Sequence, residues 1–336
     1  MAVKPALDRK GLAGHEHGVT TEFALIDALR HIATSSAARG LLDDAAVIEI
    51  GDEKLVLTLD TLVEGVHYLP DDPPDTVAWK LVAVNASDLS AKGAEPLACL
   101  YSHALGDDPW DRAFLDGLAR ASTHFGLPLL GGDTVRMPEG APRSFSLTAL
   151  GRAKRDQPVP SRGGARVGDR LWVSGTIGDG GLGLAVLRGR KAKQSAAQWL
   201  VARYRTPSPD TRLGPALAPF ASAMMDISDG LLIDVQRMAE ASGVAIGIGI
   251  ESVPLSPAFR AAAGADFDAR LMAATAGDDY CLLFTAPPEH TARIRETAAA
   301  FDRQVSAIGA VSDGSGLLLF HQGQPVPLPD HVGYRH

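Results

Sequence analysis

Cysteine, long apolar runs and excess positive charge are all scarce in this sequence of 336 residues. Only two cysteines are present, Cys99 and Cys281, and both lie in apolar stretches, so we expect buried free thiols rather than a disulfide or a metal pair. No apolar run approaches the ~20 residues of a membrane span, and the N-terminus lacks the continuous apolar segment of a secretory signal. The net charge of −8 argues against a general nucleic-acid binder. These absences fit a soluble, cytoplasmic protein without a nucleic-acid or membrane partner.

The length favours two domains of about 150 residues each. Apolar periodicity predicts helices at 22–33, 75–94, 108–126, 180–189, 196–204, 210–220, 229–242, 257–263 and 288–301. Strands are predicted in a hairpin at 45–65 and at 95–105, 127–135, 144–153, 170–178, 222–227, 245–250, 278–286 and 304–311, followed by a short tail. Asp108 is a plausible N-cap of the third helix, with Pro109 at its start.

A segment rich in Pro, Gly and Arg, without periodicity, separates the two halves of this pattern. We therefore expect a flexible extension at 1–20, an N-terminal domain at 21–153, a linker at 154–168 and a C-terminal α/β domain at 169–336. Helices and strands alternate in both halves, and the first half contains consecutive strands. The expected fold class is α/β (α+β) with mixed sheets.

Acidic residues recur where apolar elements end or meet a turn. They occur at six places: Asp43 with Asp44, Asp60, Asp88, Asp133, Asp226 with Asp229, and Asp278 with Asp279. One aspartate beside a strand is ordinary, but carboxylates are rarely buried unless they are paired or bind a metal. Six such places need a common explanation.

Asp88 is the sharpest case, because its helix is apolar on most sides. Asn85, Asp88 and Lys92 fall within roughly a 60° arc of that helix. Such a stripe points into protein or into a site, although a solvated stripe on a surface helix remains the alternative. Convergent carboxylates need counter-charge, which Mg²⁺ supplies through oxygen ligands, often together with substrate phosphates. Candidate basic partners are Lys92, Arg136 and Arg162, and Gly131 and Gly132 would let the backbone approach a ligand.

Three other segments are weaker candidates. The glycine-rich residues 175–183 match neither phosphate-binding glycine motif, and a turn that begins a helix is favoured there. "GHEH" at 14–17 could bind a soft metal but lies in a polar terminus, and the arginine-rich residues 203–212 are typical of a solvated loop. In "MMDISDGLLIDVQRM" (224–238), Ser228 or Asp229 could cap the following helix, but capping does not explain Asp226. No Ser/His/Asp or Cys/His nucleophile motif is present.

Taken together and in order, these motifs resemble the thiamine-monophosphate kinase family. They are "DDAAV", "TLDTLVEGVHY", "AVNASDLSAKGAEP", "LLGGDTVR", "DISDGLLID", "GDDYCLLFT" and the closing "GYRH". The match runs from about Glu22 to Tyr334, and the family belongs to a superfamily with aminoimidazole ribonucleotide synthetase. It implies a two-domain architecture whose N-terminal strands form a barrel across a homodimer, and ATP- and Mg²⁺-dependent phosphorylation of thiamine monophosphate to thiamine diphosphate.

The resemblance also implies roles for individual residues. The Mg²⁺ ligands, for several ions, would be Asp44, Thr58, Asp60, Asp88, Asp133, Asp226 and Asp229. The ATP contacts would be Gly132, Asp133, Arg162 and Ser228. The contacts to thiamine phosphate would be His67, Asp278 and Tyr334.

The sequence departs from the family pattern at four positions: Leu42 replaces the usual Gly, Leu59 a hydroxyl residue, Asp278 a Glu, and Arg335 an Asp. These departures concern substrate contact more than reaction type. Two rival functions stay open: a sister ATP-dependent activity of the same superfamily, and a non-catalytic protein that binds nucleotide or thiamine phosphate. A purely structural reading explains the acids as helix caps.

Overall fold

The computed structural model of the chain describes residues 22–334. Its α-helices are α1 (Glu22–Arg30), α2 (Pro74–Ala91), α3 (Asp108–Phe125), α4 (Asp179–Leu187), α5 (Gln194–Arg205), α6 (Leu213–Leu217), α7 (Leu231–Ser242), α8 (Pro257–Ala263), α9 (Phe267–Thr275) and α10 (Thr291–Ala300). Short 3₁₀ helices are η2 (Ser36–Leu41), η3 (Ala218–Phe220), η4 (Ile250–Ser252) and η5 (Pro288–His290). The predicted extension at 1–20, the "GHEH" segment and Arg335 lie outside the described residues.

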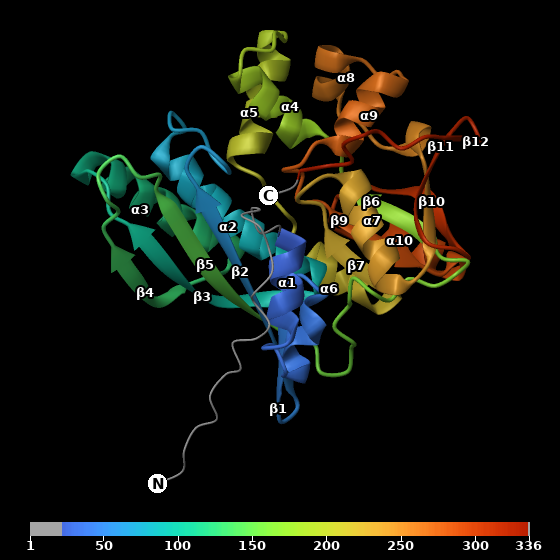
Figure 1. Cartoon of the computed structure of the whole chain (residues 1–336), viewed down its shortest axis with the longest axis horizontal. Coiled ribbons are helices and arrows are strands. Elements are labelled where there is room, and N and C mark those ends of the chain that lie inside the picture. Colours follow the sequence, from blue (N-terminus) through green and yellow to red (C-terminus); the bar gives the residue numbers. More distant parts are fainter. Residues whose placement is uncertain (1–21, 335–336) are drawn as a thin grey trace, which may run out of the picture.

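The strands form two mixed sheets (Figure 1). The first sheet contains β1 (Ala46–Ile50), β2 (Glu53–Val63), β3 (Ala94–Ala104), β4 (Leu129–Val135) and β5 (Ser144–Ala153). The second contains β6 (Arg170–Ser174), β7 (Ala223–Asp226), β8 (Ala245–Gly249), β9 (Leu282–Ala286), β10 (Val305–Ser312), β11 (Gly316–His321) and β12 (Gln324–Val326). The two mixed sheets with their helices confirm the expected α/β class.

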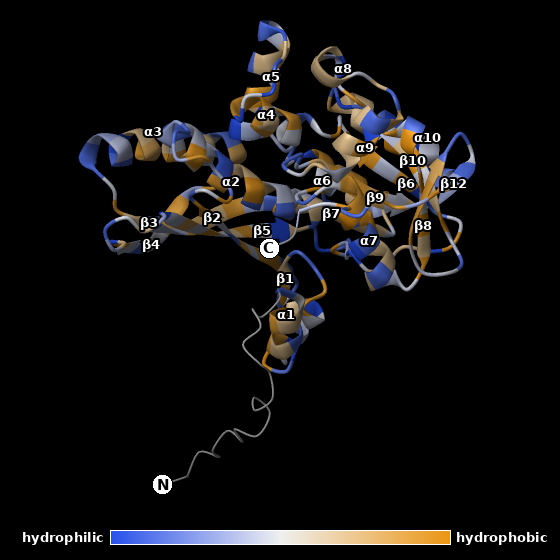
Figure 2. Cartoon of the chain, turned by 45° about the horizontal axis from the view of Figure 1, so that its top comes forward, coloured by the Kyte–Doolittle hydropathy of each residue, from blue (hydrophilic) through white to orange (hydrophobic). Residues whose placement is uncertain are grey.

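The first sheet has the strand order β1-β2-β5-β3-β4, and only β3 and β4 pair in parallel. Helices α2 and α3 lie together on one face of it (Figure 2). Helix α2 is covered on nearly all sides, since Asn85 and Lys92 are both fully buried. The polar stripe of α2 therefore faces protein and a site rather than open solvent.

No helix of residues 22–334 covers the other face of this sheet (Figure 2). Leu59 and Leu100 lie in one row across β2, β5 and β3, because both pair with Thr148. They are 62% and 43% exposed, and Leu130 on β4 is 67% exposed. Exposed leucines on a sheet that is uncovered on one side indicate a candidate interaction surface, although Thr148 separates Leu59 from Leu100. The sheet is open in the single chain, and a barrel between two chains stays a prediction.

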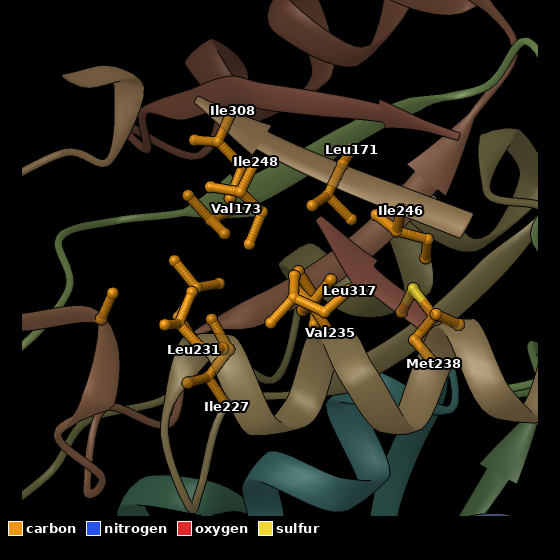
Figure 3. Close-up of a cluster of buried hydrophobic side chains, with 14 of the residues drawn as sticks. Leu171, Val173, Ile227, Leu231, Val235, Met238, Ile246, Ile248, Ile308 and Leu317 are labelled. Atoms are coloured by element: carbon orange, nitrogen blue, oxygen red, sulfur yellow. The ribbon is translucent and has the colours of Figure 1, made fainter. Parts of the chain in front are cut away.

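The second sheet has the order β12-β11-β8-β10-β6-β9-β7, with only β8 and β11 parallel, and is covered on both faces. On one face, Leu231, Val235 and Met238 of α7 recur at helical spacing and pack against strand residues such as Ile246 (Figure 3). On the other, α6 and α10 cover a second apolar cluster that includes Trp172. This double cover fixes the end of β7, where Asp226 lies.

Several sequence-based element predictions need correction. Helix α9 and strands β11 and β12 were not predicted, because their apolar residues lie in short segments between turns. The N-cap of α3 is Asp107 rather than Asp108: the Asp107 side chain accepts a hydrogen bond from the Trp110 N–H at 2.9 Å. Residues 203–205 are not a solvated loop but the last turn of α5, where Tyr204 is buried.

Other predictions agree with the structure. Both cysteines are buried and unpaired. Gly178 is the N-cap of α4, so residues 175–183 form a helix start, as expected. No helix among residues 22–334 has the length and apolar character required to cross a membrane. The domain division at 154–168 stays a prediction.

Candidate active site

A pocket of about 700 Å³ lies where the two halves of the chain meet. Ten of the site residues named from the sequence line it: Asp44, Asp60, His67, Asp88, Arg162, Asp226, Ser228, Asp229, Asp278 and Tyr334. They come from β2, α2, the ends of β7 and β9, and the loops beside them. Segments far apart in the sequence thus place their polar residues around one space.

Strand β2 and helix α2 build one wall of this pocket. Thr58 and Asp60 are two residues apart on β2 and therefore point to the same face, toward α2. The Thr58 hydroxyl donates a short hydrogen bond to Asp88, and the Asp60 N–H donates to Asn85 Oδ1 at 3.2 Å. Thr58 lies behind the pocket surface and holds Asp88 in place.

Three carboxylates in the pocket, Asp60, Asp88 and Asp226, form no ion pair within residues 22–334, and we call them the uncompensated trio. Burial is the main cause that raises their pKa values, and neighbouring aspartates add to it. The pKa is raised to about 6 for Asp60 and to about 8 for Asp226, and well above the usual value for Asp88. Asp226 also accepts a hydrogen bond from the Ser87 hydroxyl at 2.6 Å. Without a bound cation, these groups oppose one another's ionisation.

Two further carboxylates, which we call the compensated pair, are Asp43 and Asp44. Lys92 Nζ lies 2.8 Å from Asp44 Oδ2 and forms a short contact with Asp43. Arg162 forms a short ion pair with Asp44, and Arg39 forms one with Asp43. Burial alone would raise the pKa of Asp44, but the charges of Arg162 and Lys92 hold it far below its usual range. Asp44 is therefore ionised, and cationic side chains of the protein itself already contact both carboxylates of the pair.

The start of α7 does not use Ser228 or Asp229 as a cap, so that prediction was wrong. The N-cap is Gly230, with φ 130°, and it makes no side-chain hydrogen bond. Instead, the Asp234 carboxylate inside the helix accepts from the N–H groups of Ser228 and Asp229 at 3.1 and 3.2 Å. Asp229 pairs with Arg237 at 2.6 Å. The side chains of Ser228 and Asp229 are thus left at the pocket surface.

The opposite end of the pocket contains His67, Asp278 and Tyr334. His67 Nδ1 accepts from the Val63 N–H at 3.0 Å. The Asp278 N–H donates to the Ser228 carbonyl at 2.8 Å, and the Tyr334 N–H donates to the Asp229 carbonyl at 2.9 Å. The backbone at 227–229 therefore lies between the loop at 277–281 and the C-terminal segment, and it joins both ends of the pocket.

Gly132 and Asp133 do not reach this pocket. Strand β4 carries them at the edge of the sheet, and three strand spacings separate it from β2, or about 14 Å at roughly 4.8 Å per spacing. Asp133 is exposed and pairs with Ser102 in register. A side chain at Gly132 would approach the Tyr101 carbonyl to 1.8 Å, so close strand packing accounts for this glycine. Arg136, at the end of β4, is exposed as well.

Sequence reasoning missed three residues of the site. Lys80, from the apolar run "AWKLVAV", contacts Asp278 and is buried. Tyr280 donates to Asp278 Oδ1 at 2.9 Å, and Arg237 pairs with Asp229. A lysine within an apolar helix was the one signal that could have been used, because such a charge must find a partner.

The donor set fits hard divalent cations such as Mg²⁺. The uncompensated trio and Asp229 offer carboxylate oxygens, which this ion prefers. Within residues 22–334, no three acidic, histidine or cysteine side chains already enclose a single ion position. Mg²⁺ does not need such a cage, because it is usually held by one or two carboxylates plus water and substrate phosphates.

Comparison with known families agrees with this fold. Residues 42–153 match the family described as AIR synthase related protein, N-terminal domain, and residues 166–321 match AIR synthase related protein, C-terminal domain. The chain thus contains both domains of an AIR synthase-related protein.

Individual relatives narrow this assignment. The thiamine-monophosphate kinase of Caulobacter vibrioides is 39% identical over 308 residues, which cover 89% of this chain and 85% of that protein. The enzyme of the same name from Salmonella typhimurium is 36% identical over 88% of this chain and 91% of its own length. A solved structure described as AaThiL complexed with AMPPCP and TMP has a TM-score of 0.81 and 32% identity, covering 94% of this chain and 97% of that one. The chain belongs to the thiamine-monophosphate kinase family.

Proposed function

We propose that this chain phosphorylates thiamine monophosphate to thiamine diphosphate with ATP as the phosphoryl donor and Mg²⁺ as the required metal. The observation that carries the proposal is the uncompensated trio, which lies in one pocket together with basic side chains such as Arg162 and Arg237. Relatives named thiamine-monophosphate kinase, and a related structure with an ATP analogue and TMP, support the choice of substrates. The sister activities find support only at the level of the fold.

The residues of the chain would divide the work of binding two polyanions. Asp60, Asp88, Asp226 and Asp229 would hold Mg²⁺, with Asp44 joining them once Arg162 turns toward nucleotide phosphate. Bound Mg²⁺ would neutralise the charge on the phosphate oxygens during in-line transfer. The acceptor phosphate is already ionised near neutral pH, given a second pKa of about 6, so no strong general base is required. His67, Asp278 and Tyr334 would hold the thiamine phosphate.

We further propose that the chain acts as a homodimer through the uncovered face of the first sheet. The exposed residues Leu59, Leu100 and Leu130 support this. Burying their apolar surface against a partner would stabilise the dimer by about 25 cal/mol for each Å² removed from water. A partner would also give β4 a neighbour. Asp133, remote from the pocket of its own chain, would then be available to the pocket of the other chain.

The decisive test of the reaction is a product assay. Purified protein with ATP, Mg²⁺ and thiamine monophosphate should form ADP and thiamine diphosphate in equal amounts. Binding of both substrates without ADP formation would favour the non-catalytic rival. Turnover only with substrates of the sister enzymes would favour a sister activity.

Sedimentation tests the dimer. Leu59→Glu should produce monomers, because a charge would be buried at the centre of the contact. Glu49→Lys, on the exposed β1 strand, offers a control in which one surface charge replaces another. An unchanged sedimentation coefficient for Leu59→Glu would contradict this interface.

A further inference from the structure

Two lysines of α2 are almost completely buried, Lys80 at 2% exposure and Lys92 at 0%. They lie about 18 Å apart along the helix, at roughly 1.5 Å per residue. Lys92 belongs with the compensated pair at one end of the pocket. Lys80 lies near the other end of the pocket. The roles in binding and catalysis proposed above do not include Lys80.

Lys80 joins segments from both halves of the chain. Its Nζ lies 2.7 Å from Asp278 Oδ1 and donates to the His67 carbonyl at 3.1 Å. It also lies 4.0 Å from the centre of the Tyr204 ring on α5. A buried ammonium is retained only when such partners compensate its lost hydration. One side chain thus ties the loop after β2 to the loop before β9.

These contacts determine how Asp278 faces the pocket. Oδ1 takes two partners, the Lys80 ammonium and the Tyr280 hydroxyl at 2.9 Å. Asp278 and Tyr280 have φ values of 65° and 52°, a left-handed conformation that is unfavourable for residues other than glycine. Such a backbone persists only where its surroundings hold it. The second oxygen, Oδ2, makes no hydrogen bond or ion pair within residues 22–334, so it can accept a hydrogen bond from a ligand.

His67 complements this carboxylate. Because Nδ1 accepts from the Val63 N–H, a neutral His67 ring carries its proton on Nε2 and is a donor there. A donor suits a phosphate, and a carboxylate oxygen suits an amino or cationic group. Thiamine monophosphate has both kinds of group.

We propose that Lys80 is a positioning residue for the acceptor substrate, which sets the His67 loop and the Asp278 carboxylate at the separation that thiamine phosphate requires. The inference rests on the function proposed above and adds a residue to it. It also explains why the shorter Asp serves at position 278: Lys80 and Tyr280 hold its carboxylate in place without the reach of a glutamate.

Calorimetric binding of thiamine monophosphate, together with steady-state kinetics, tests the proposal. Lys80→Met should raise the dissociation constant and KM for thiamine monophosphate by at least about tenfold, since it removes a charge-assisted contact. KM for ATP should stay within about twofold. Tyr280→Phe, which removes one hydroxyl, should raise the same constants by about threefold.

Two matched variants separate positioning from general destabilisation. Thr285→Val disrupts a buried contact to the Ala223 N–H in the second sheet, far from Lys80, and should lower the melting temperature without changing the affinity for thiamine monophosphate. Lys92→Met changes the buried lysine at the other end of α2 and should lower stability while leaving the affinity for thiamine monophosphate unchanged.

The outcomes are distinct. Weaker binding of thiamine monophosphate alone supports the proposal; unchanged binding, or an equal loss for ATP, overturns it. If Lys80→Met does not fold, Lys80→Arg, which keeps the charge but alters the contact with Asp278, decides by the same measure. Wild-type protein that binds thiamine monophosphate without turnover would refute the proposed reaction. The difference in thiamine monophosphate affinity between wild type and Lys80→Met would still test the role of Lys80.

Discussion

The compensated pair and the uncompensated trio contain the same type of residue in one pocket, yet their surroundings give them opposite properties. Asp44 is held ionised by Lys92 and Arg162, whereas burial and neighbouring acids raise the pKa of Asp226 to about 8. The pair uses the protein's own cations and contributes to folding. The trio forms no such ion pair within residues 22–334, and we propose that bound Mg²⁺ supplies its counter-charge. On this proposal, the pair stabilises the folded chain and the trio binds the metal.

Removing a member of the trio should have the largest effect. Asp226→Asn should lower kcat/KM by about a thousandfold at limiting Mg²⁺, because it removes an anionic ligand next to the reacting phosphates. The metal-free protein should lose little stability, because the raised pKa of Asp226 favours its uncharged form near neutral pH, and Asn resembles that form. Activity is measured across a Mg²⁺ titration and stability by urea unfolding. Asp313→Asn, on an exposed turn, is the control, and full turnover of Asp226→Asn at limiting Mg²⁺ would remove the trio from the mechanism.

Removing the cation of the compensated pair should act on stability instead. Lys92→Met should lower the free energy of unfolding by about 3 kcal/mol, as expected when one partner of a buried ion pair is lost. Urea unfolding with and without Mg²⁺ measures this. Part of the lost stability should return with Mg²⁺, which can replace the missing charge beside Asp44. Lys191→Met, an exposed position, should change stability by less than about 0.5 kcal/mol. An equally small change for Lys92→Met would show that the pair is not structural.

The two groups should give stability opposite dependences on pH. The folded pKa values of Asp60 and Asp226, about 6 and about 8, lie above the unfolded value near ~4. The folded state therefore binds more protons, and stability without Mg²⁺ should fall as pH rises from about 4 to 8, by up to about 1.4 kcal/mol per pH unit for each titrating group. Asp44, with its lowered pKa, contributes stability above about pH 4 that is lost at lower pH.

Urea midpoints measured across this pH range, with EDTA and with saturating Mg²⁺, check the prediction. Saturating Mg²⁺ should flatten the fall, because it favours the ionised trio. A slope that Mg²⁺ leaves unchanged would mean that the trio does not bind the ion.

The smallest effect is expected at the residue that links the two groups. The Thr58 hydroxyl contacts Asp88 and lies 3.3 Å from the Asp44 carbonyl. Thr58→Val should reduce stability by about 1 kcal/mol and raise the Mg²⁺ concentration needed for half-maximal rate a few-fold, since Asp88 loses a donor. Thr123→Val, on the exposed side of α3, is the control. If Thr58→Val shows the Mg²⁺ dependence of the wild type, Thr58 does not contribute to metal binding.

Much of the fold could be predicted from sequence because apolar periodicity is strong in long elements such as α2 and β2. The stripe of Asn85, Asp88 and Lys92 was recognisable for the same reason. The short elements α9, β11 and β12 were not, since their burial depends on contacts made only in the folded chain. The N-cap of α3 was assigned to Asp108 instead of Asp107 because either of two neighbouring aspartates could cap the helix, and the sequence does not distinguish them.

The site was predictable in its residue types but not in its pairings. Six acidic places suggested a metal, yet nothing in the sequence separates Asp44 from Asp226; only the distances to Lys92 and Arg162 do so. Asp133 follows an apolar segment just as the other candidate aspartates do. Its distance from the pocket follows from the strand order of the sheet, which the sequence pattern does not give. The hydrogen bonds from the backbone N–H groups of Ser228 and Asp229 to the Asp234 carboxylate could not be predicted, because they depend on the backbone conformation at Gly230.

The backbone at 227–229 has a thermodynamic consequence. Ser228 accepts from Asp278 at the acceptor end, Asp229 accepts from Tyr334, and Asp226 stands one residue before this strip at the metal end. If binding of one substrate restricts the motion of residues 227–229, less conformational entropy of this segment is lost when the second substrate binds. Thiamine monophosphate and the nucleotide should then strengthen each other's affinity by the same factor, because such coupling is reciprocal.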